Sequence, residues 1–199
     1  MNLPNKLTIL RILLVPIMVI IPFFHIQGTL WGIPIEFLII DAIFIIAALT
    51  DKLDGHIARS RNQITTFGKF LDPIADKIVV ITAMIMLVEF GHLPAWIPII
   101  VIFREFVVSG YRLVAVQKDG NVIAANVWGK LKTVTQMVAI ILAFLDTNPY
   151  GAIFNGGLTG FAFVINLFVT LTMSVSVVAT IFSGWEYIKG GKDLFKDSM

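Results

Sequence analysis

Six long apolar segments alternate with short polar links along this chain. The segments cover about 7–25, 34–51, 73–90, 94–112, 132–147 and 158–183. Each is close to the roughly 20 residues that a helix needs to cross the hydrocarbon core of a bilayer. The pattern predicts an all-α integral membrane protein with six transmembrane helices. No repeat, low-complexity tract or linker divides the chain, so we expect a single membrane domain over residues 1–199.

The basic residues fall on alternate links. They lie at both ends of the chain, between the second and third segments, and between the fourth and fifth. The other links, at 26–33, 91–93 and 148–157, contain neither Lys nor Arg. Because Lys and Arg accumulate on the cytoplasmic side of membrane proteins, we expect both termini to be cytoplasmic. Arg104 is an exception, since it falls near the middle of the fourth segment, beside Glu105.

Composition agrees with a membrane protein and excludes several kinds of site. Hydrophobic residues make up 57% of the 199 residues and charged residues only 14%, against about a quarter in soluble domains. The absence of cysteine excludes disulfides and thiolate metal sites. The three histidines are scattered, and a net charge of +2 is too small to indicate a nucleic-acid-binding protein. Since the chain opens without a transit peptide, we expect a bacterial plasma membrane.

Four aspartates lie between the second and third apolar segments. They belong to the pattern Asp51-x-x-Asp54-Gly55-x-x-Ala58-Arg59, eight residues, then Gly68-x-x-x-Asp72-x-x-x-Asp76. Carboxylates at a membrane are costly unless they bind a cation. Oxygen ligands favour magnesium, manganese or calcium. Two divalent ions beside a lipid indicate chemistry on a phosphate group, which a metal pair can clamp.

The spacing of these residues places them on helix faces. If the second helix continues through 51–59, Asp51, Asp54, Gly55, Ala58 and Arg59 fall within an arc of about 140°. The two small residues would let a flat group approach the backbone, and the arginine could reach a phosphate.

The second half of the motif indicates a similar face. Gly68, Asp72 and Asp76 are spaced by four, on one face of a helix leading into the third segment. Pro73 is tolerated there if that helix begins nearby. A simpler interpretation makes Asp72 an N-cap and pairs Asp51 and Asp54 with neighbouring cations. The length and specificity of the whole motif favour a functional site.

The motif resembles the signature of the CDP-alcohol phosphotransferases, an integral membrane family. All eight signature positions from Asp51 to Asp76 are present with the family's spacing. Residues 2–11, 104–112 and 129–133 are also similar to the bacterial branch of the family that makes phosphatidylglycerol phosphate. The resemblance therefore extends over most of the chain.

The resemblance implies transfer of a phosphatidyl group from CDP-diacylglycerol to an alcohol, with release of CMP. By the same resemblance, Asp51, Asp54, Asp72 and Asp76 would hold two divalent cations, Mg²⁺ or Mn²⁺, and Asp76 would take the proton of the attacking hydroxyl. The donor and nucleotide site would consist of Asn5, Thr8, Asp51, Gly55, Ala58, Arg59 and Gly68. Family members commonly form homodimers, which we expect here too.

The acceptor alcohol is a separate question. Four cations on the fourth and fifth segments could bind an acceptor phosphate, namely Arg104, Arg112, Lys130 and Lys132. They favour a phosphorylated acceptor over serine, and the similarity at 104–112 and 129–133 favours glycerol 3-phosphate. Inositol phosphate, serine and phosphatidylglycerol remain alternative acceptors. Simple ion pairing of Arg104 with Glu105, and an ordinary positive-inside role for the two lysines, also remain open.

A cation transporter is the alternative outside the enzymes, because carboxylates within a membrane can bind an ion in transit. Transporters usually carry repeated halves with broken helices near the midplane. This chain shows no repeat, and its carboxylates gather toward one face, so the enzyme is the leading hypothesis. No role is assigned to Asp41 or Glu89.

Overall fold

The computed structural model describes residues 2–60, 66–119 and 127–190. Six long helices account for most of this part of the chain: α1 (Leu3–Ile20), α2 (Ile35–Ser60), α3 (Thr66–Glu89), α4 (Trp96–Asp119), α5 (Val127–Leu145) and α6 (Gly160–Gly190). Within these helices, the side chains at 3–4, 52–60, 66–67, 69–70, 112–119 and 190 lie outside the described part. The all-α prediction is confirmed for the residues described.

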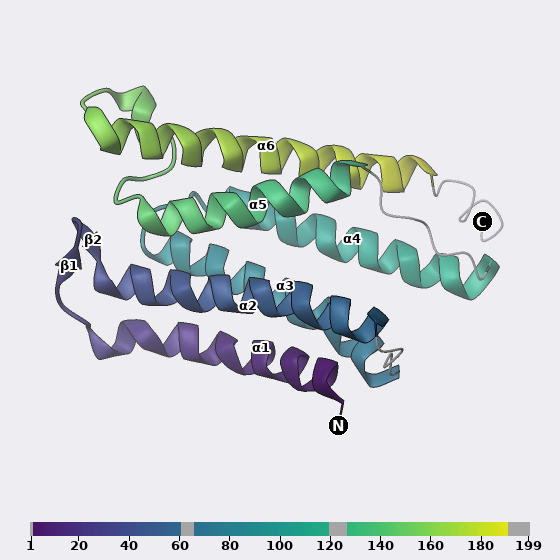
Figure 1. Ribbon diagram of the computed structural model, residues 1–199. Helices are drawn as coiled ribbons and strands as arrows, with labels where there is room; N and C mark the ends of the chain where they lie inside the picture. The colour runs from purple at the N-terminus through teal and green to yellow at the C-terminus, as the bar shows by residue number, and fades with distance from the viewer. Residues whose placement is uncertain (1, 61–65, 120–126, 191–199) are drawn as a thin grey trace.

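The six helices run side by side along a common direction, as Figure 1 shows. Helix α1 forms one edge of the bundle and α6 the opposite edge, with the other four between them. Helix α1 packs against α2 and α3, and α5 packs along α6. The start of α1 and the end of α6 lie at the same end of the bundle (Figure 1).

Short elements close the opposite end of the bundle. They are the 3₁₀ helices η1 (Ile21–Phe24) and η2 (Ala152–Asn155), and the paired strands β1 (Thr29–Leu30) and β2 (Ile33–Pro34). The two residues between the strands, Trp31 and Gly32, both have positive φ, at 54° and 81°. Positive φ at both central residues is the geometry of a tight hairpin turn, which the glycine adopts without strain.

Apolar side chains fill the core and also cover much of the surface, as expected for a protein in lipid. The core combines apolar side chains from all the long helices, including Met18, Phe44, Leu87, Ile140 and Met173, all fully buried. Many other large apolar side chains are exposed on the outside of the bundle, among them Leu13, Phe103, Phe106 and Phe161. Such a surface is stable where hydrocarbon replaces water, so the protein is a membrane protein.

Three helical stretches of the described residues are long and apolar enough to cross a membrane: Asn5–Phe24, Val127–Leu145 and Gly160–Lys189. Helices α2, α3 and α4 are as long, but they carry charged residues such as Asp51, Asp76 and Glu105. The number of spans therefore stays a prediction.

The helices extend beyond the apolar segments at the motif. Helix α2 runs to Ser60, so the predicted continuation through 51–59 is confirmed. Helix α3 begins at Thr66, before the apolar segment starts, and contains Gly68, Asp72 and Asp76 on its first turns. The alternative of Asp72 as an N-cap is wrong, because six helical residues precede it. Pro73 is an interior residue of α3, where its ring removes one backbone hydrogen bond.

Candidate active site

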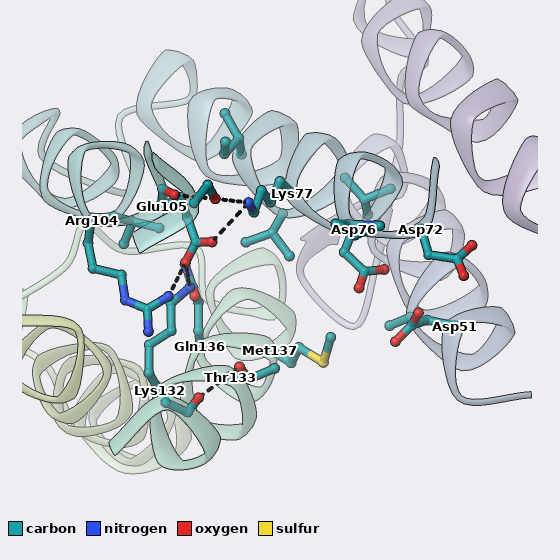
Figure 2. A pocket seen from close by; sticks show the side chains of 18 of the residues that line it. Asp51, Asp72, Asp76, Lys77, Arg104, Glu105, Lys132, Thr133, Gln136 and Met137 are labelled. Carbon is teal, nitrogen blue, oxygen red and sulfur yellow. Dashed lines mark hydrogen bonds and ion pairs between the residues drawn. The ribbon is translucent and has the colours of Figure 1, made fainter. Parts of the chain in front are cut away.

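A cavity of about 430 Å³ lies among the six long helices, and its lining residues include Gly129 near the start of α5 and Tyr187 near the end of α6. Every long helix contributes to its wall. Charged residues that line it are Arg11, Asp51, Asp72, Asp76, Lys77, Arg104, Glu105 and Lys132. Figure 2 shows the aspartates grouped on one side and the Arg104–Glu105–Lys132 group on the other, with Lys77 between them. The three aspartates with Arg11 are called here the carboxylate end, and Glu105 with Lys77, Arg104 and Lys132 the cationic end.

The carboxylate end joins α1, α2 and α3. Arg11 Nη1 lies 2.6 Å from Asp76 Oδ1 and 3.0 Å from Asp51 Oδ1. Thr8 Oγ1 donates a 2.6 Å hydrogen bond to Asp72 Oδ1. Because one guanidinium bridges two carboxylates that are distant in sequence, the three helices are tied together at this point.

The partners on α1 form one buried stripe. Asn5, Thr8 and Arg11 are spaced by three, which brings them to the same face of the helix, and all three are buried. The Arg11 side chain is only 1% exposed. A buried arginine within an apolar helix is costly unless it is paired, and the aspartates provide that pairing.

The cationic end is organised around Glu105 of α4. Its Oε1 accepts hydrogen bonds from Lys132 Nζ at 2.6 Å and from Arg104 Nη1 at 2.8 Å. Its Oε2 lies 3.9 Å from Lys77 Nζ. Lys77 also donates to Ser109 Oγ, which in turn donates to the Glu105 carbonyl oxygen at 2.6 Å. Three cations from α3, α4 and α5 thus share one carboxylate.

Helix α6 fixes the far side of Arg104. The Nη2 atom of Arg104 donates to Ser183 Oγ, and its guanidinium carbon lies 5.9 Å from the ring centroid of Tyr187. A Cβ atom at Gly184 would come within 3.3 Å of Arg104 Cγ. The glycine therefore lets the arginine pass close to α6 on its way to the cavity.

The two ends of the cavity carry opposite charge. Among the described lining residues, three aspartates against Arg11 leave two negative charges at the carboxylate end. Three cations against Glu105 leave two positive charges at the cationic end. A site with low-dielectric walls strengthens such fields. The cavity is therefore suited to hold a cation at one end and an anion at the other.

The donor set of the carboxylate end fits a hard divalent cation. The available oxygens are carboxylates, which magnesium and manganese prefer, and three aspartates against one buried guanidinium leave this end with net negative charge. Within the described residues, no three His, Asp or Glu side chains form a ready metal-ligand group. The side chain of Asp54, the fourth predicted ligand, lies outside the described part.

Several other predicted residues also lie outside the described side chains. They are Ala58, Arg59 and Arg112, together with Gly55, whose backbone is part of α2. Gly68 is buried on α3. Lys130 is exposed on α5 and is not among the described residues that line the cavity, although Lys132, two residues later, is one of them. Asp41 is buried at 4% exposure in α2, and Glu89 is exposed at the end of α3.

Three lining residues were not selected from the sequence. Arg11 and Lys77 belong to the basic residues that predict the topology, and Glu105 is predicted only as a possible partner for Arg104. The sequence does contain an indication for Arg11, because this cation falls inside an apolar segment at helical spacing from Asn5 and Thr8. For Lys77 and Glu105, the decisive fact is their mutual approach from different helices, which sequence spacing does not reveal.

Comparison with known proteins identifies the family of this chain. The family model described as CDP-alcohol phosphatidyltransferase matches residues 1–182. The chain belongs to the CDP-alcohol phosphatidyltransferase family. The resemblance seen in the aspartate motif is thereby confirmed, and the match includes every lining residue of the carboxylate end and the cationic residues up to Lys132.

Curated members of this family are similar over their full length. A protein of Bacillus subtilis named CDP-diacylglycerol–glycerol-3-phosphate 3-phosphatidyltransferase is 42% identical over 205 residues, covering 99% of this chain and 98% of its own. Proteins of the same name from Haemophilus influenzae and Wigglesworthia glossinidia brevipalpis are 33% and 34% identical. They cover 100% and 99% of this chain, and 97% and 99% of their own.

Proposed function

We propose that this CDP-alcohol phosphatidyltransferase moves the phosphatidyl group of CDP-diacylglycerol to glycerol 3-phosphate, giving phosphatidylglycerol phosphate and CMP. The names of three full-length relatives support this reaction and this acceptor. The observation that carries the proposal is the cavity with a carboxylate end and a cationic end. A reaction between a diphosphate donor and a phosphorylated alcohol needs both ends at once.

The carboxylate end takes the donor. Asp51, Asp54, Asp72 and Asp76 would hold two divalent cations, Mg²⁺ or Mn²⁺. When bound, these ions supply charge neutralisation of the diphosphate and of the departing CMP. Asn5, Thr8, Gly55, Ala58, Arg59 and Gly68 surround the nucleotide and its phosphates. The Thr8 hydrogen bond to Asp72 and the Arg11 contact with Asp51 support a prepared arrangement at this end.

The cationic end takes the acceptor. Arg104 and Lys132 bind the phosphate of glycerol 3-phosphate, together with Arg112 and Lys130 in our proposal. An arginine binds phosphate oxygens in pairs, and an ammonium offers three donors. Their position supports this role, since Arg104 and Lys132 line the same cavity as the aspartates.

The transfer itself needs a base and close positioning. Asp76 accepts the proton of the acceptor hydroxyl, whose oxygen forms a new bond to the phosphorus of the phosphatidyl group. The bond from that phosphorus to the oxygen of CMP breaks, and CMP leaves with the bonding electron pair. A carboxylate is a weak base, so holding the two substrates at the right distance contributes much of the rate.

The membrane arrangement follows from the same proposal. All six long helices cross the bilayer in one domain over 1–199, with both termini and the cavity at the cytoplasmic face of a bacterial plasma membrane. The acyl chains of the donor stay in lipid while its CDP head enters the cavity. The start of α1 and the end of α6 lie at one end, which supports an even number of crossings (Figure 1). A homodimer is also part of the proposal, from the family resemblance.

Release of CMP tests the proposal. Purified protein in detergent is given CDP-diacylglycerol and magnesium, with and without glycerol 3-phosphate. Release only with glycerol 3-phosphate is expected. Release with inositol phosphate, serine or phosphatidylglycerol instead would keep the donor and overturn the acceptor. Absence of release with every acceptor would overturn the enzyme and leave the cation transporter to be tested.

A further inference from the structure

Three cations surround the single carboxylate of Glu105, which is more than an ion pair between helices requires. We infer that Glu105 is a positioning residue for the acceptor. It holds Lys77, Arg104 and Lys132 as one preformed cationic wall that binds a phosphate dianion. The inference rests on the proposed function and deepens it, because neither Glu105 nor Lys77 belongs to the acceptor site assigned above.

The contacts give Glu105 a central place. Its two carboxylate oxygens face cations on α3, α4 and α5, at 3.9, 2.8 and 2.6 Å. The side chain is 14% exposed, and those of Arg104 and Lys132 are about as buried. Figure 2 shows Glu105 lying between the lysine of α3 and that of α5. Without the carboxylate, two buried cations and the half-buried Lys77 would face one another and repel.

The charge of the group indicates what it binds. A single carboxylate would complete an ion pair with a single cation, but here three cations share it, and two positive charges remain. Burial of uncompensated charge is unfavourable. A phosphate monoester carries about two negative charges at neutral pH. The two surplus positive charges therefore match one phosphate group. A neutral or zwitterionic alcohol would leave them unbalanced.

The cations keep donors for a ligand while Glu105 holds them. An ammonium has three N–H donors and a guanidinium has five. The contact with Glu105 uses one donor of Lys132 and one of Arg104. A phosphate can therefore bind beside the carboxylate instead of displacing it. This arrangement fixes long flexible side chains in advance, which lowers the entropy lost on binding.

The place of Lys77 connects the wall to the reacting groups. It directly follows Asp76 on α3, and its side chain lies between the carboxylate end and Glu105 (Figure 2). With 33% of its side chain exposed, Lys77 is the most accessible of the three cations in contact with Glu105. A phosphate held by Lys77 and Lys132 would place the rest of a small acceptor near Asp76.

Kinetics of Glu105→Gln and Lys77→Gln test the inference in the full-length protein in detergent. The amide keeps the shape of Glu105 and removes its charge. We expect the KM for glycerol 3-phosphate to rise at least tenfold in each variant. The KM for CDP-diacylglycerol should stay within about twofold, and Glu105→Asp should recover part of the acceptor affinity. Glu89→Gln, at the exposed end of α3, is the matched control and should change neither KM.

A binding measurement complements the kinetics. Glycerol 3-phosphate should raise the thermal unfolding temperature of the wild type, glycerol should not, and the increase should be lost in Glu105→Gln. Equal changes in both KM values, or lower stability with an unchanged acceptor KM, would make Glu105 a structural ion pair and overturn the inference. Absence of acceptor-dependent CMP release by the wild type would instead overturn the proposed function on which it rests. Should Glu105→Gln fail to fold, Lys77→Gln decides alone, since its side chain is the more exposed.

Discussion

Arg11 Nη1 lies 2.6 Å from Asp76 Oδ1, so a buried cation of α1 contacts the carboxylate that we propose as the proton acceptor. The same nitrogen is 3.0 Å from Asp51. These contacts join the first helix to the two helices that carry the aspartate motif. The arginine therefore ties both carboxylates to α1.

Replacement of this arginine should weaken the site and the fold together. In Arg11→Gln, two carboxylates lose their shared cation. Because Asp51 and Asp76 are 32% and 46% exposed, we expect a cost of about 1–3 kcal/mol, below the roughly 3–5 kcal/mol typical of a fully buried pair. Thermal unfolding in EDTA should occur at a lower temperature than in the wild type, and magnesium should reduce the difference.

The control for this prediction is Lys6→Gln, which removes an exposed cation from the same helix. An Arg11→Gln protein with the unfolding temperature of wild type in EDTA would show that the arginine does not hold the carboxylates.

Loss of charge at the two aspartates of α3 should abolish turnover. In Asp76→Asn the proton acceptor is gone, and loss of a general base typically costs about 10²–10⁴-fold in rate. Asp72→Asn removes the charge of a proposed metal ligand and weakens the hydrogen bond that Asp72 accepts from Thr8. Both variants should still insert and fold, although Asp76→Asn removes one partner of the buried Arg11 and should unfold at a somewhat lower temperature. Near-normal CMP release from either protein would remove the proposed roles of these aspartates.

The hydrogen bond from Thr8 to Asp72 gives a subtler test. Thr8→Val keeps the size of the buried side chain and removes its donor. A hydrogen bond to a charged group contributes about 1.5–3 kcal/mol, so we expect kcat/KM for CDP-diacylglycerol to fall by about one to two orders of magnitude. Thr8→Ser retains the hydroxyl and should recover most of the activity. Equal losses in the two variants would assign the effect to packing.

Removal of divalent metal should stop the reaction reversibly. EDTA should abolish CMP release, because four carboxylates facing a diphosphate need cations to offset their charge. Added magnesium or manganese should restore it, while added potassium at the same ionic strength should not. Full activity in EDTA would contradict the assignment of the aspartates as metal ligands.

A stability prediction concerns the end of the bundle opposite the site. Asn166 of α6, fully buried, donates to Asp146 Oδ2 at 2.6 Å and to the Pro149 carbonyl at 2.9 Å, and accepts from Ile153 N–H at 3.0 Å. Asn166→Ala would leave these groups without their partner, at about 1–3 kcal/mol for each unsatisfied group.

We expect a clearly lower unfolding temperature for Asn166→Ala, with both KM values unchanged at temperatures where the variant is folded. Asn155→Ala, at an exposed position of the same loop region, is the control. An unchanged unfolding temperature for Asn166→Ala would show that the loop is held by other contacts.

Local features of the sequence predicted most of the helices and the carboxylate end. Runs of apolar residues locate the helices, and a spacing of four brings Asp72 and Asp76 to one face of α3. Helix ends were less predictable, since α3 begins at Thr66 in a polar stretch where hydropathy gives no signal. The hairpin at 29–34 was not predicted, because a strand of two residues is too short to show alternating apolar and polar residues.

Contacts between distant residues could not be predicted from one sequence. Arg11 and Asp76 are 65 positions apart, and Lys132 meets Glu105 across two helices. Periodicity gives the face of each helix but not which faces meet. For this reason the sequence indicated cations for an acceptor phosphate, while the role of Glu105 in holding them emerged only from the packing of α3, α4 and α5.

The most direct test of the account is transfer of labelled glycerol 3-phosphate into lipid by wild-type protein and by Asp76→Asn. Both are purified in detergent and given CDP-diacylglycerol and magnesium, and the organic-extractable label is compared with the CMP released. The account predicts one labelled phosphatidylglycerol phosphate for each CMP in the wild type, and no labelled lipid with the variant. CMP release without labelled lipid, or equal labelling by the variant, would contradict it.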